Sequence, residues 1–293
     1  MGKISLKLNG RQHLSTVVGI IIVLIVYIVL NRIISYDFLQ FDHRGYFDKM
    51  FNNEPFSFMD WFYLIWNRDI RWLTINLFII VVIILLLFRF RFKRAENFRL
   101  TKHTAIVALL CFIPAIIGGS YAMYYLYKQG ELHWESQIVE FLRLIYAVGL
   151  FEELIDRGYI TNNLFSLKSK GLKTPVAIAI SAVIFWFVHV QGAVISALFS
   201  GTPFSIISWG FGEQFINLTF FGVSMAVILY YKKDIVSLIC IHAAHNILLY
   251  SYLGSGELLL MGALYAVFYA VFIVCYPVFL IYKARKSRML RSG

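Results

Sequence analysis

The sequence predicts an all-α fold, a polytopic membrane protein built as a bundle of about eight transmembrane helices. Of its 293 residues, 60% are hydrophobic and only 15% are charged, whereas about a quarter of the residues of a soluble domain are charged. The apolar residues also fall into long blocks, and a block of about 20 such residues crosses a bilayer as a helix. Backbone amides inside lipid need partners within their own segment, which favours helices.

Run length divides the chain into eight apolar segments joined by more polar connections. The first segment is too long for a signal-peptide core, so we expect it to remain as a membrane helix. The third contains Pro114 and the pair Gly118-Gly119, which are expected kink points. The segments are 17–34, 72–88, 104–127, one beginning near 138, one from 174 to about 190, 215–231, 235–250 and 258–282.

Basic residues gather at the two ends of the chain and in alternate connections, while the other connections are mixed or acidic. The positive-inside rule therefore predicts that both termini lie in the cytoplasm, which requires an even number of spans. The same distribution accounts for the net charge of +11 without nucleic acid. We expect a multi-pass protein of the cell membrane that contacts the lipid bilayer and binds no nucleic acid.

Two connections differ from the rest in composition. Residues 36–71 are rich in Phe and Trp interleaved with acids, which is typical of an aromatic belt at the membrane interface rather than of an amphipathic surface segment. Residues 191–214 are apolar but contain several helix breakers, so this connection either re-enters the membrane or forms a lid. The breakers are Gly201, Pro203, Gly210 and Gly212.

Ionisable groups inside a span are costly, on the order of 3 kcal/mol each by insertion scales, and they mark candidate functional residues. The fourth segment contains Glu152, Glu153 and Arg157. Glu153 and Arg157 are four residues apart and share a helix face, which suits an internal ion pair. Adjacent residues point about 100° apart on a helix, so Glu152 faces elsewhere and is a candidate general base. The alternative is a solvated patch at the interface.

Two later segments carry polar residues as well. His189 lies at the end of the apolar fifth segment, where an interfacial histidine is the alternative interpretation. His242 and Asn246 are four residues apart in the seventh segment and share a helix face. An imidazole and an amide placed in this way can donate hydrogen bonds to a developing oxyanion. We expect the neighbouring His245 to pack against or support the site rather than to react.

Glu152, His189, His242 and Asn246 together fit peptide hydrolysis in two ways. In one, Glu152 and His189 activate a water molecule while His242 and Asn246 stabilise the tetrahedral intermediate. In the other, Glu152, His189 and His242 bind a catalytic metal ion, because two histidines and a glutamate with an open position are a common zinc arrangement. Both alternatives stay open at the level of sequence.

The three motifs resemble those of the CPBP family of CAAX proteases and bacteriocin-processing proteins, also called the Abi family. They are Glu-Glu-x-x-x-Arg at 152–157, Phe-x-x-x-His at 185–189 and His-x-x-x-Asn at 242–246, in the family's order. The resemblance implies an intramembrane endopeptidase that acts on a peptide or a membrane protein. It implies either a zinc metalloprotease or a metal-free enzyme with a glutamate base. It places Glu152, His189, His242 and Asn246 in the active site, with Glu153 and Arg157 in support.

The resemblance also suggests how the chain is organised. Residues 1–137 form an N-terminal three-helix membrane region with a surface loop, 138–251 a CPBP-like catalytic core, and 252–293 the last transmembrane helix with a basic tail. Asp156 departs from the family, which commonly has an apolar or aromatic residue before the arginine. An extra acid there can compete with Glu153 for Arg157 and alter activity.

Two other functions fit the same residues. One is a catalytically silent scaffold or regulator of the same family. The other is a transporter whose buried acids and histidines relay protons, although no inverted repeat of broken helices supports it. The sequence selects neither a prenylated substrate nor an oligomeric state.

The rise of a helix sets a geometric condition on the site. At 1.5 Å per residue, His189 lies about 24 Å from the cytoplasmic end of its segment, but Glu152 lies only about 8 Å from that side if its helix ends at Arg157. Glu152 reaches about 22 Å if the helix continues to about Leu167. A joint site therefore requires a fourth helix that extends beyond Arg157.

Overall fold

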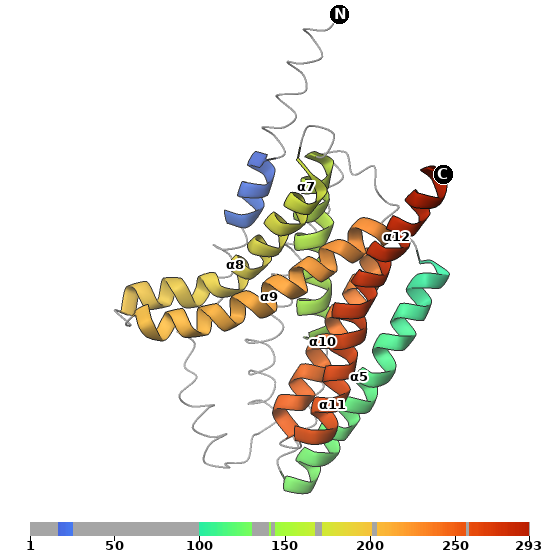
Figure 1. Cartoon of the computed structure of the whole chain (residues 1–293). Helices are drawn as coiled ribbons and strands as arrows, with labels where there is room; N and C mark the ends of the chain where they lie inside the picture. The colour runs from blue at the N-terminus through green and yellow to red at the C-terminus, as the bar shows by residue number, and fades with distance from the viewer. Residues whose placement is uncertain are drawn as a thin grey trace, which may run out of the picture. The chain divides into compact units, whose positions relative to one another are not determined.

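The computed structural model of the chain describes residues 17–25, 100–130, 141, 144–167, 172–200, 204–255 and 258–292. Within these ranges all the regular structure is helical, as the all-α prediction requires (Figure 1). Besides a helical stretch at residues 17–25, the elements are α5 (Lys102–Gln129), η3 (Leu144–Glu152), η4 (Leu154–Thr161), α7 (Asn162–Ser166), α8 (Thr174–Ser200), α9 (Phe204–Lys232), α10 (Ile235–Ser255), α11 (Leu258–Tyr269), η6 (Ala270–Cys275) and α12 (Tyr276–Ser292).

Four helices in the described part of the chain are long and apolar enough to cross a membrane. They coincide with the third, sixth, seventh and eighth predicted segments, while the fifth predicted segment forms the first part of α8, where Thr174–Val190 is apolar. The four are Lys102–Gln129, Gln214–Lys232, Ile235–Leu253 and Leu259–Leu290. The predicted span at 72–88 and the aromatic connection at 36–71 lie outside the described residues, so the total of eight stays a prediction.

The fourth predicted segment is helical from Leu144 to Ser166, since η3, η4 and α7 follow one another with only the helical Glu153 between the first two. The extension beyond Arg157 that the depth argument requires is therefore confirmed. Most of this segment is π-helix rather than the ordinary α-helix expected, with wider turns that occur frequently at functional sites. It is not among the four long apolar helices, because residues 152–157 include four charges.

The chain divides into two compact units, and two of the boundaries between them fall inside η4 and α9. The first unit comprises Met1–Phe78 and Tyr159–Thr219, and the second comprises Ile79–Gly158 and Phe220–Gly293. The second unit therefore contains α5, η3, α10, α11 and α12, whereas the first contains α7, α8 and the first half of α9. The domain boundaries predicted at 137 and 251 stay a prediction.

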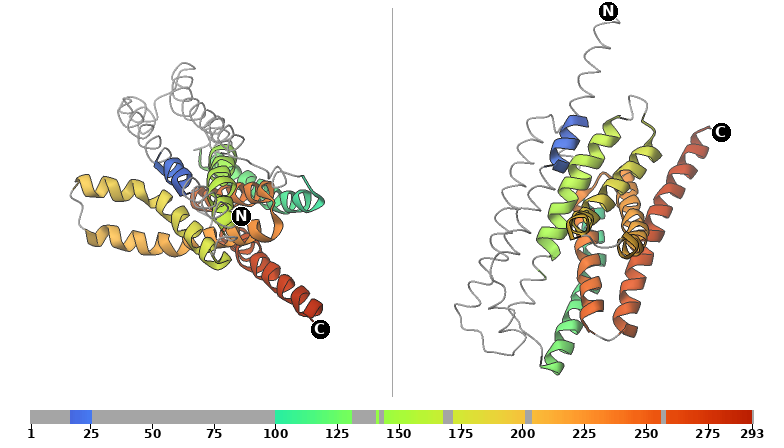
Figure 2. Two further views of the ribbon diagram at one scale, coloured as in Figure 1. Left: turned by 90° about the horizontal axis from the view of Figure 1, so that it is seen from above. Right: turned by 90° about the vertical axis from the view of Figure 1, so that its left-hand side faces the viewer.

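In the first unit, α8 and the first half of α9 form a helical hairpin, seen side by side in both views (Figures 1 and 2). Only residues 201–203 separate the two helices, so most of the predicted connection over 191–214 is helical. Whether it re-enters the membrane or forms a lid stays a prediction. Of the expected helix breakers, Gly210 and Gly212 lie inside α9. A glycine is disfavoured in a helix by only about 1 kcal/mol, and the apolar residues around these two are good enough helix formers to continue through them.

In the second unit, α10 packs against α5, η3 and α11. The pair Gly118-Gly119, expected as a kink point, lies buried within the continuous helix α5. A Cβ atom at Gly118 would lie 2.9 Å from Cδ2 of Leu248 on α10. These glycines therefore allow α5 and α10 to approach closely, a common role for small residues between membrane helices.

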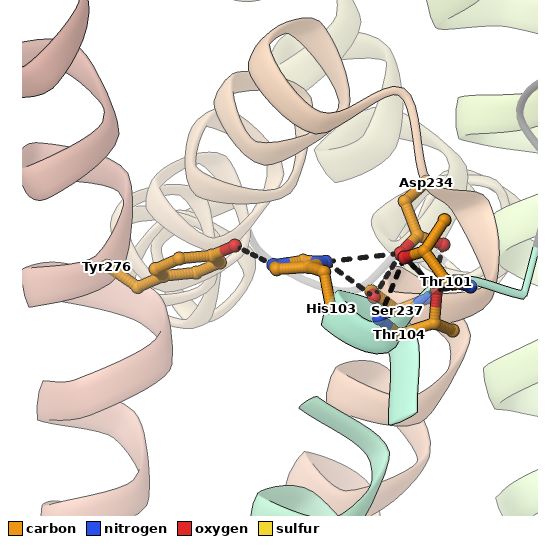
Figure 3. A network of polar contacts seen from close by, with 6 residues as sticks. All are labelled: Thr101, His103, Thr104, Asp234, Ser237 and Tyr276. Atoms are coloured by element: carbon orange, nitrogen blue, oxygen red, sulfur yellow. Dashed lines mark hydrogen bonds and ion pairs between the residues drawn. The ribbon is translucent and has the colours of Figure 1, made fainter. Parts of the chain in front are cut away.

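A polar network joins the beginnings of α5 and α10 to α12, and we call it the Asp234 clasp (Figure 3). Asp234 caps α10 by accepting a hydrogen bond from the Ser237 amide, and it accepts another from the Thr104 hydroxyl at 2.8 Å. His103 lies 3.3 Å from Asp234 through Nδ1 and contacts the Tyr276 hydroxyl through Nε2. The clasp places the two connections that precede α5 and α10 at one end of the second unit, as their shared predicted sidedness requires.

Burial alone would raise the pKa of the Asp234 carboxyl. The hydrogen bonds from Ser237, Thr104 and His103 outweigh burial and leave this pKa below its ordinary value. Asp234 therefore remains a carboxylate that accepts bonds from two helix ends, where the partial positive charge of each helix favours it.

Candidate active site

The charged cluster of the fourth segment is buried in the second unit. Arg157 is fully buried, and its Nη1 lies 3.0 Å from Oε1 of the equally buried Glu153. This is the ion pair predicted from their spacing. Asp156 is also buried, and its Oδ2 lies 3.8 Å from the same nitrogen. The extra acid thus adds a second, longer contact to Arg157 without displacing Glu153.

His242 lies between the two adjacent glutamates. Its Nδ1 is 2.7 Å from Oε1 of Glu153, so the ring N–H donates to the carboxylate. Nε2 lies 3.8 Å from Oε2 of Glu152. The two glutamates, which were predicted to face different directions, approach different nitrogens of one ring. Two neighbouring residues can do so because the imidazole presents its nitrogens on different edges.

A close helix contact brings these groups together. Gly149 of η3 packs directly against Ala243 of α10, where a Cβ atom on Gly149 would lie 2.9 Å from the Ala243 Cβ and 3.2 Å from its Cα. Gly149 is one helical turn before Glu153, and Ala243 follows His242. The absence of a side chain at Gly149 therefore permits the 2.7 Å bond between Glu153 and His242. A glycine inside an apolar segment, one turn before the acidic pair, is the sequence signal of this contact.

His245 and Asn246, one helical turn beyond His242 on α10, carry buried side-chain nitrogens. Nδ2 of Asn246 and Nδ1 of His245 are each buried, with no hydrogen-bond partner among the described residues. Leaving a buried donor unsatisfied costs about 1–3 kcal/mol, so such a group calls for an explanation. The Asn246 amide lies one helical turn beyond His242, as predicted, and is a donor available to an incoming acceptor.

Phe221 of α9 is a site neighbour that the sequence did not indicate. Its ring is buried and lies 4.9 Å from the His242 ring and 4.8 Å from the His245 ring, measured between centroids. The Arg157 guanidinium lies 6.0 Å from the same centroid. One phenylalanine among 27 in the sequence carries no distinguishing pattern, so only the fold identifies it.

His189 belongs to the first unit, on α8. Its Nδ1–H donates to the backbone oxygen of Phe185 at 2.8 Å, and its ring packs on the Phe185 ring at 4.3 Å. The bond leaves the lone pair on Nε2 and explains why the two residues occur four apart. The position of His189 relative to Glu152 and His242 stays a prediction, because those residues belong to the second unit.

Two of the three predicted metal ligands fit a metal in their geometry. Ligand atoms about a tetrahedral zinc ion lie roughly 3.3 Å apart, and Nε2 of His242 is 3.8 Å from Oε2 of Glu152. Glu153 on Nδ1 is the kind of partner that a metal-binding histidine usually has. No three His, Cys, Asp or Glu side chains of the described ranges come together as a metal site, and the third ligand predicted from the sequence, His189, stays a prediction.

One protein-family model matches part of the chain. Residues 133–248 match the family model described as type II CAAX prenyl endopeptidase Rce1-like, which confirms the resemblance to CAAX proteases. The matched stretch contains all six residues of the predicted site. No curated protein and no solved structure matches the chain.

Proposed function

We propose that this Rce1-like chain is an intramembrane endopeptidase that hydrolyses a peptide bond of a membrane-associated peptide or protein. The observation that carries the proposal is the bond between Glu153 and His242, 2.7 Å long and buried, with Glu152 on the other side of the ring. A histidine oriented by one carboxylate and facing a second is the arrangement that acid–base hydrolysis needs.

In the proposed mechanism Glu152 is the general base. It takes a proton from a water molecule that Nε2 of His189 helps to orient, and the resulting hydroxide adds to the carbonyl carbon of the substrate. Glu152 then returns the proton to the departing amine as the carbon–nitrogen bond breaks. The half-buried position of Glu152, with 15% of its side chain exposed, suits a base that must meet both water and substrate.

His242 and Asn246 stabilise the oxyanion. With a hydrogen on each ring nitrogen, His242 would donate Nδ1–H to Glu153 and Nε2–H toward the oxyanion. Arg157 holds Glu153 in place through the 3.0 Å ion pair. Asn246 adds its Nδ2–H, which has no partner among the described residues and therefore loses no bond when it turns to the substrate.

A metal ion is the alternative form of this site. Glu152 and His242, completed by His189, would hold it, and zinc would supply a Lewis acid that polarises the carbonyl and lowers the pKa of bound water. The oriented Nδ1–H of His242 and the spare amide of Asn246 serve either form.

The test is peptide cleavage by the purified protein in lipid nanodiscs, with farnesylated and unmodified peptides as separate probes. We expect Glu152→Gln, His189→Ala and His242→Ala each to lower kcat by at least about 100-fold, since each removes a group that acts on the reacting atoms. Asn163→Ala is the control, because the Asn163 side chain donates to a carbonyl of its own helical segment, Tyr159 O, at 2.9 Å, and Asn163 is not one of the proposed site residues.

The outcomes separate the classes of function. Full activity in all three variants would exclude the proposed peptidase site. A wild-type protein that cleaves no probe, yet loses its cellular phenotype on His242→Ala, would favour a scaffold of the same family. Metal analysis of the same preparations, with chelation and readdition, separates the metal-free form from the metal-dependent one.

A further inference from the structure

Phe221 connects the charged part of the site to its histidines. The side chain is 4% exposed, and its ring lies 4.9 Å from the ring of His242, measured between centroids. The same ring lies 6.0 Å from the Arg157 guanidinium, within the range of a cation–π interaction. Phe221 therefore contacts both residues that bind Glu153, namely His242 and Arg157.

The His242 ring needs a fixed plane to face both glutamates. Its 2.7 Å bond to Glu153 holds one atom, Nδ1, but a bond to one atom leaves the ring free to tilt about it. Only one orientation keeps Nε2 directed toward Oε2 of Glu152, 3.8 Å away. The Phe221 ring packs on the His242 ring at an interplanar angle of 56°, which blocks tilting on that side.

Phe221 is itself held from behind by aromatic residues. His245 contacts it at 4.8 Å, and His245 in turn packs against Tyr265 at 5.4 Å and Tyr269 at 6.0 Å on α11. This row of rings links α9, α10 and α11. Close packing gives Phe221 little space to move, and it assigns His245 the packing role expected from the sequence.

From these contacts we infer that Phe221 is a positioning residue, which fixes the plane of His242 and keeps water from the Arg157–Glu153 ion pair. The inference rests on the proposed peptidase function for its consequence in catalysis. Misplacing a reacting group by about 1 Å can lower a rate about 100-fold. We therefore expect loss of the ring to lower kcat by about 10- to 100-fold, with KM changed by less than about threefold.

The kinetic test compares Phe221→Leu with Phe220→Leu. Phe220 is the matched control because it is the adjacent residue, is 43% exposed and contacts Tyr269 rather than the catalytic histidine. The prediction is a selective fall in kcat for Phe221→Leu, with recovery in Phe221→Tyr, which retains the ring. A second ring-free variant, Phe221→Met, replaces Phe221→Leu if that protein does not fold. Equal kcat in the folded ring-free variant and in Phe220→Leu would overturn the inference.

A second readout does not depend on activity. In protein labelled with nitrogen-15 histidine, the Nδ1–H of His242 should give a proton resonance shifted downfield by its bond to Glu153, assigned by its loss in His242→Ala. We expect this resonance to disappear or broaden in Phe221→Leu and to persist in Phe220→Leu. An unchanged resonance in Phe221→Leu would overturn the positioning role of Phe221, even if the wild-type protein cleaved no peptide. Loss of the resonance in Phe221→Leu would support that role, even if the peptidase function failed its own test.

Discussion

At the scale of single residues, the two adjacent glutamates have different environments. Glu153 is fully buried between Arg157 and Nδ1 of His242, at 3.0 and 2.7 Å. Glu152 is partly exposed and lies 3.8 Å from Nε2 of the same ring. Burial and pairing suit Glu153 to a fixed role, whereas Glu152 can exchange protons with water. The two positions should therefore respond differently to the same substitution.

Glu153→Gln should destabilise the protein, whereas Glu152→Gln should mainly inactivate it. Removing one partner of a buried ion pair leaves the other charge uncompensated, which typically lowers the free energy of unfolding by about 3–5 kcal/mol. For Glu152→Gln we expect a change below about 1 kcal/mol. Unfolding in mixed micelles of increasing SDS content measures both. Equal loss of stability in the two variants would contradict these roles.

Asn246→Ala should lower activity without lowering stability. Loss of one oxyanion donor typically reduces kcat by about 100- to 1000-fold. Nδ2 of Asn246 makes no hydrogen bond within the described ranges, so its removal should change the free energy of unfolding by less than about 1 kcal/mol. Peptide cleavage and SDS unfolding on one preparation give both numbers. An active but unstable variant would indicate a structural role instead.

At the scale of helices, the contact between η3 and α10 sets the geometry of the site. Gly149→Ala keeps every reactive group yet places a Cβ 2.9 Å from Ala243 Cβ and 3.2 Å from its backbone Cα. The two helices must then separate, and the bond between Glu153 and His242 lengthens. We expect kcat to fall by about 100-fold.

Gly158→Ala is the matched control for Gly149→Ala. A Cβ atom added at Gly158 would lie 3.7 Å from both Glu153 O and Ile235 Cδ1, which is an ordinary van der Waals contact distance. Activity should therefore stay within about threefold of wild type. A Gly149→Ala protein as active as this control would show that the close helix contact is not needed for the site.

The Asp234 clasp should make stability depend on pH. The pKa of Asp234 in the folded protein lies below its ordinary value of 3.8, so the unfolded chain takes up a proton first as the pH falls. The contribution of Asp234 is therefore complete well above pH 4 and is lost as the pH falls through 3.8 and then through the folded pKa. Asp234→Asn should be less stable by about 1–3 kcal/mol at pH 7, with the difference shrinking in acid. A difference that is constant from pH 7 to 3 would contradict this assignment.

The elements that the sequence predicted correctly were those set by local pattern. Run length located the long apolar helices, and the spacing of Glu153 and Arg157 predicted their ion pair. The contacts of His242 with both glutamates, and the position of Phe221 on it, depend on packing between helices far apart in sequence. No periodicity encodes these contacts. The π-helical turns of η3 and η4 were also missed, because residues typical of α-helices form them.

At the scale of the whole molecule, the charge pattern predicts the orientation in the membrane. The Asp234 clasp joins the starts of α5 and α10 to α12 (Figure 3), and the positive-inside rule places this end in the cytoplasm together with both termini. A reporter that is active only in the cytoplasm should be active when it is fused to either terminus. A reporter signal from the opposite side of the membrane at one end alone would contradict an even number of spans.

His189 lies in the first unit, whereas Glu152 and His242 lie in the second. The helical continuity from Leu144 to Ser166 satisfies the depth condition that the sequence set for Glu152. The joint action of these three residues in catalysis stays a prediction.

The central claim is that a water molecule activated at Glu152 cleaves a peptide bond. Cleavage in water enriched in oxygen-18, followed by mass spectrometry of the products, tests it most directly. The account predicts one heavy oxygen in the new carboxylate formed by the wild-type protein and no product above background from Glu152→Gln. Equal amounts of labelled product from both proteins would contradict the role of Glu152 and with it the proposed site.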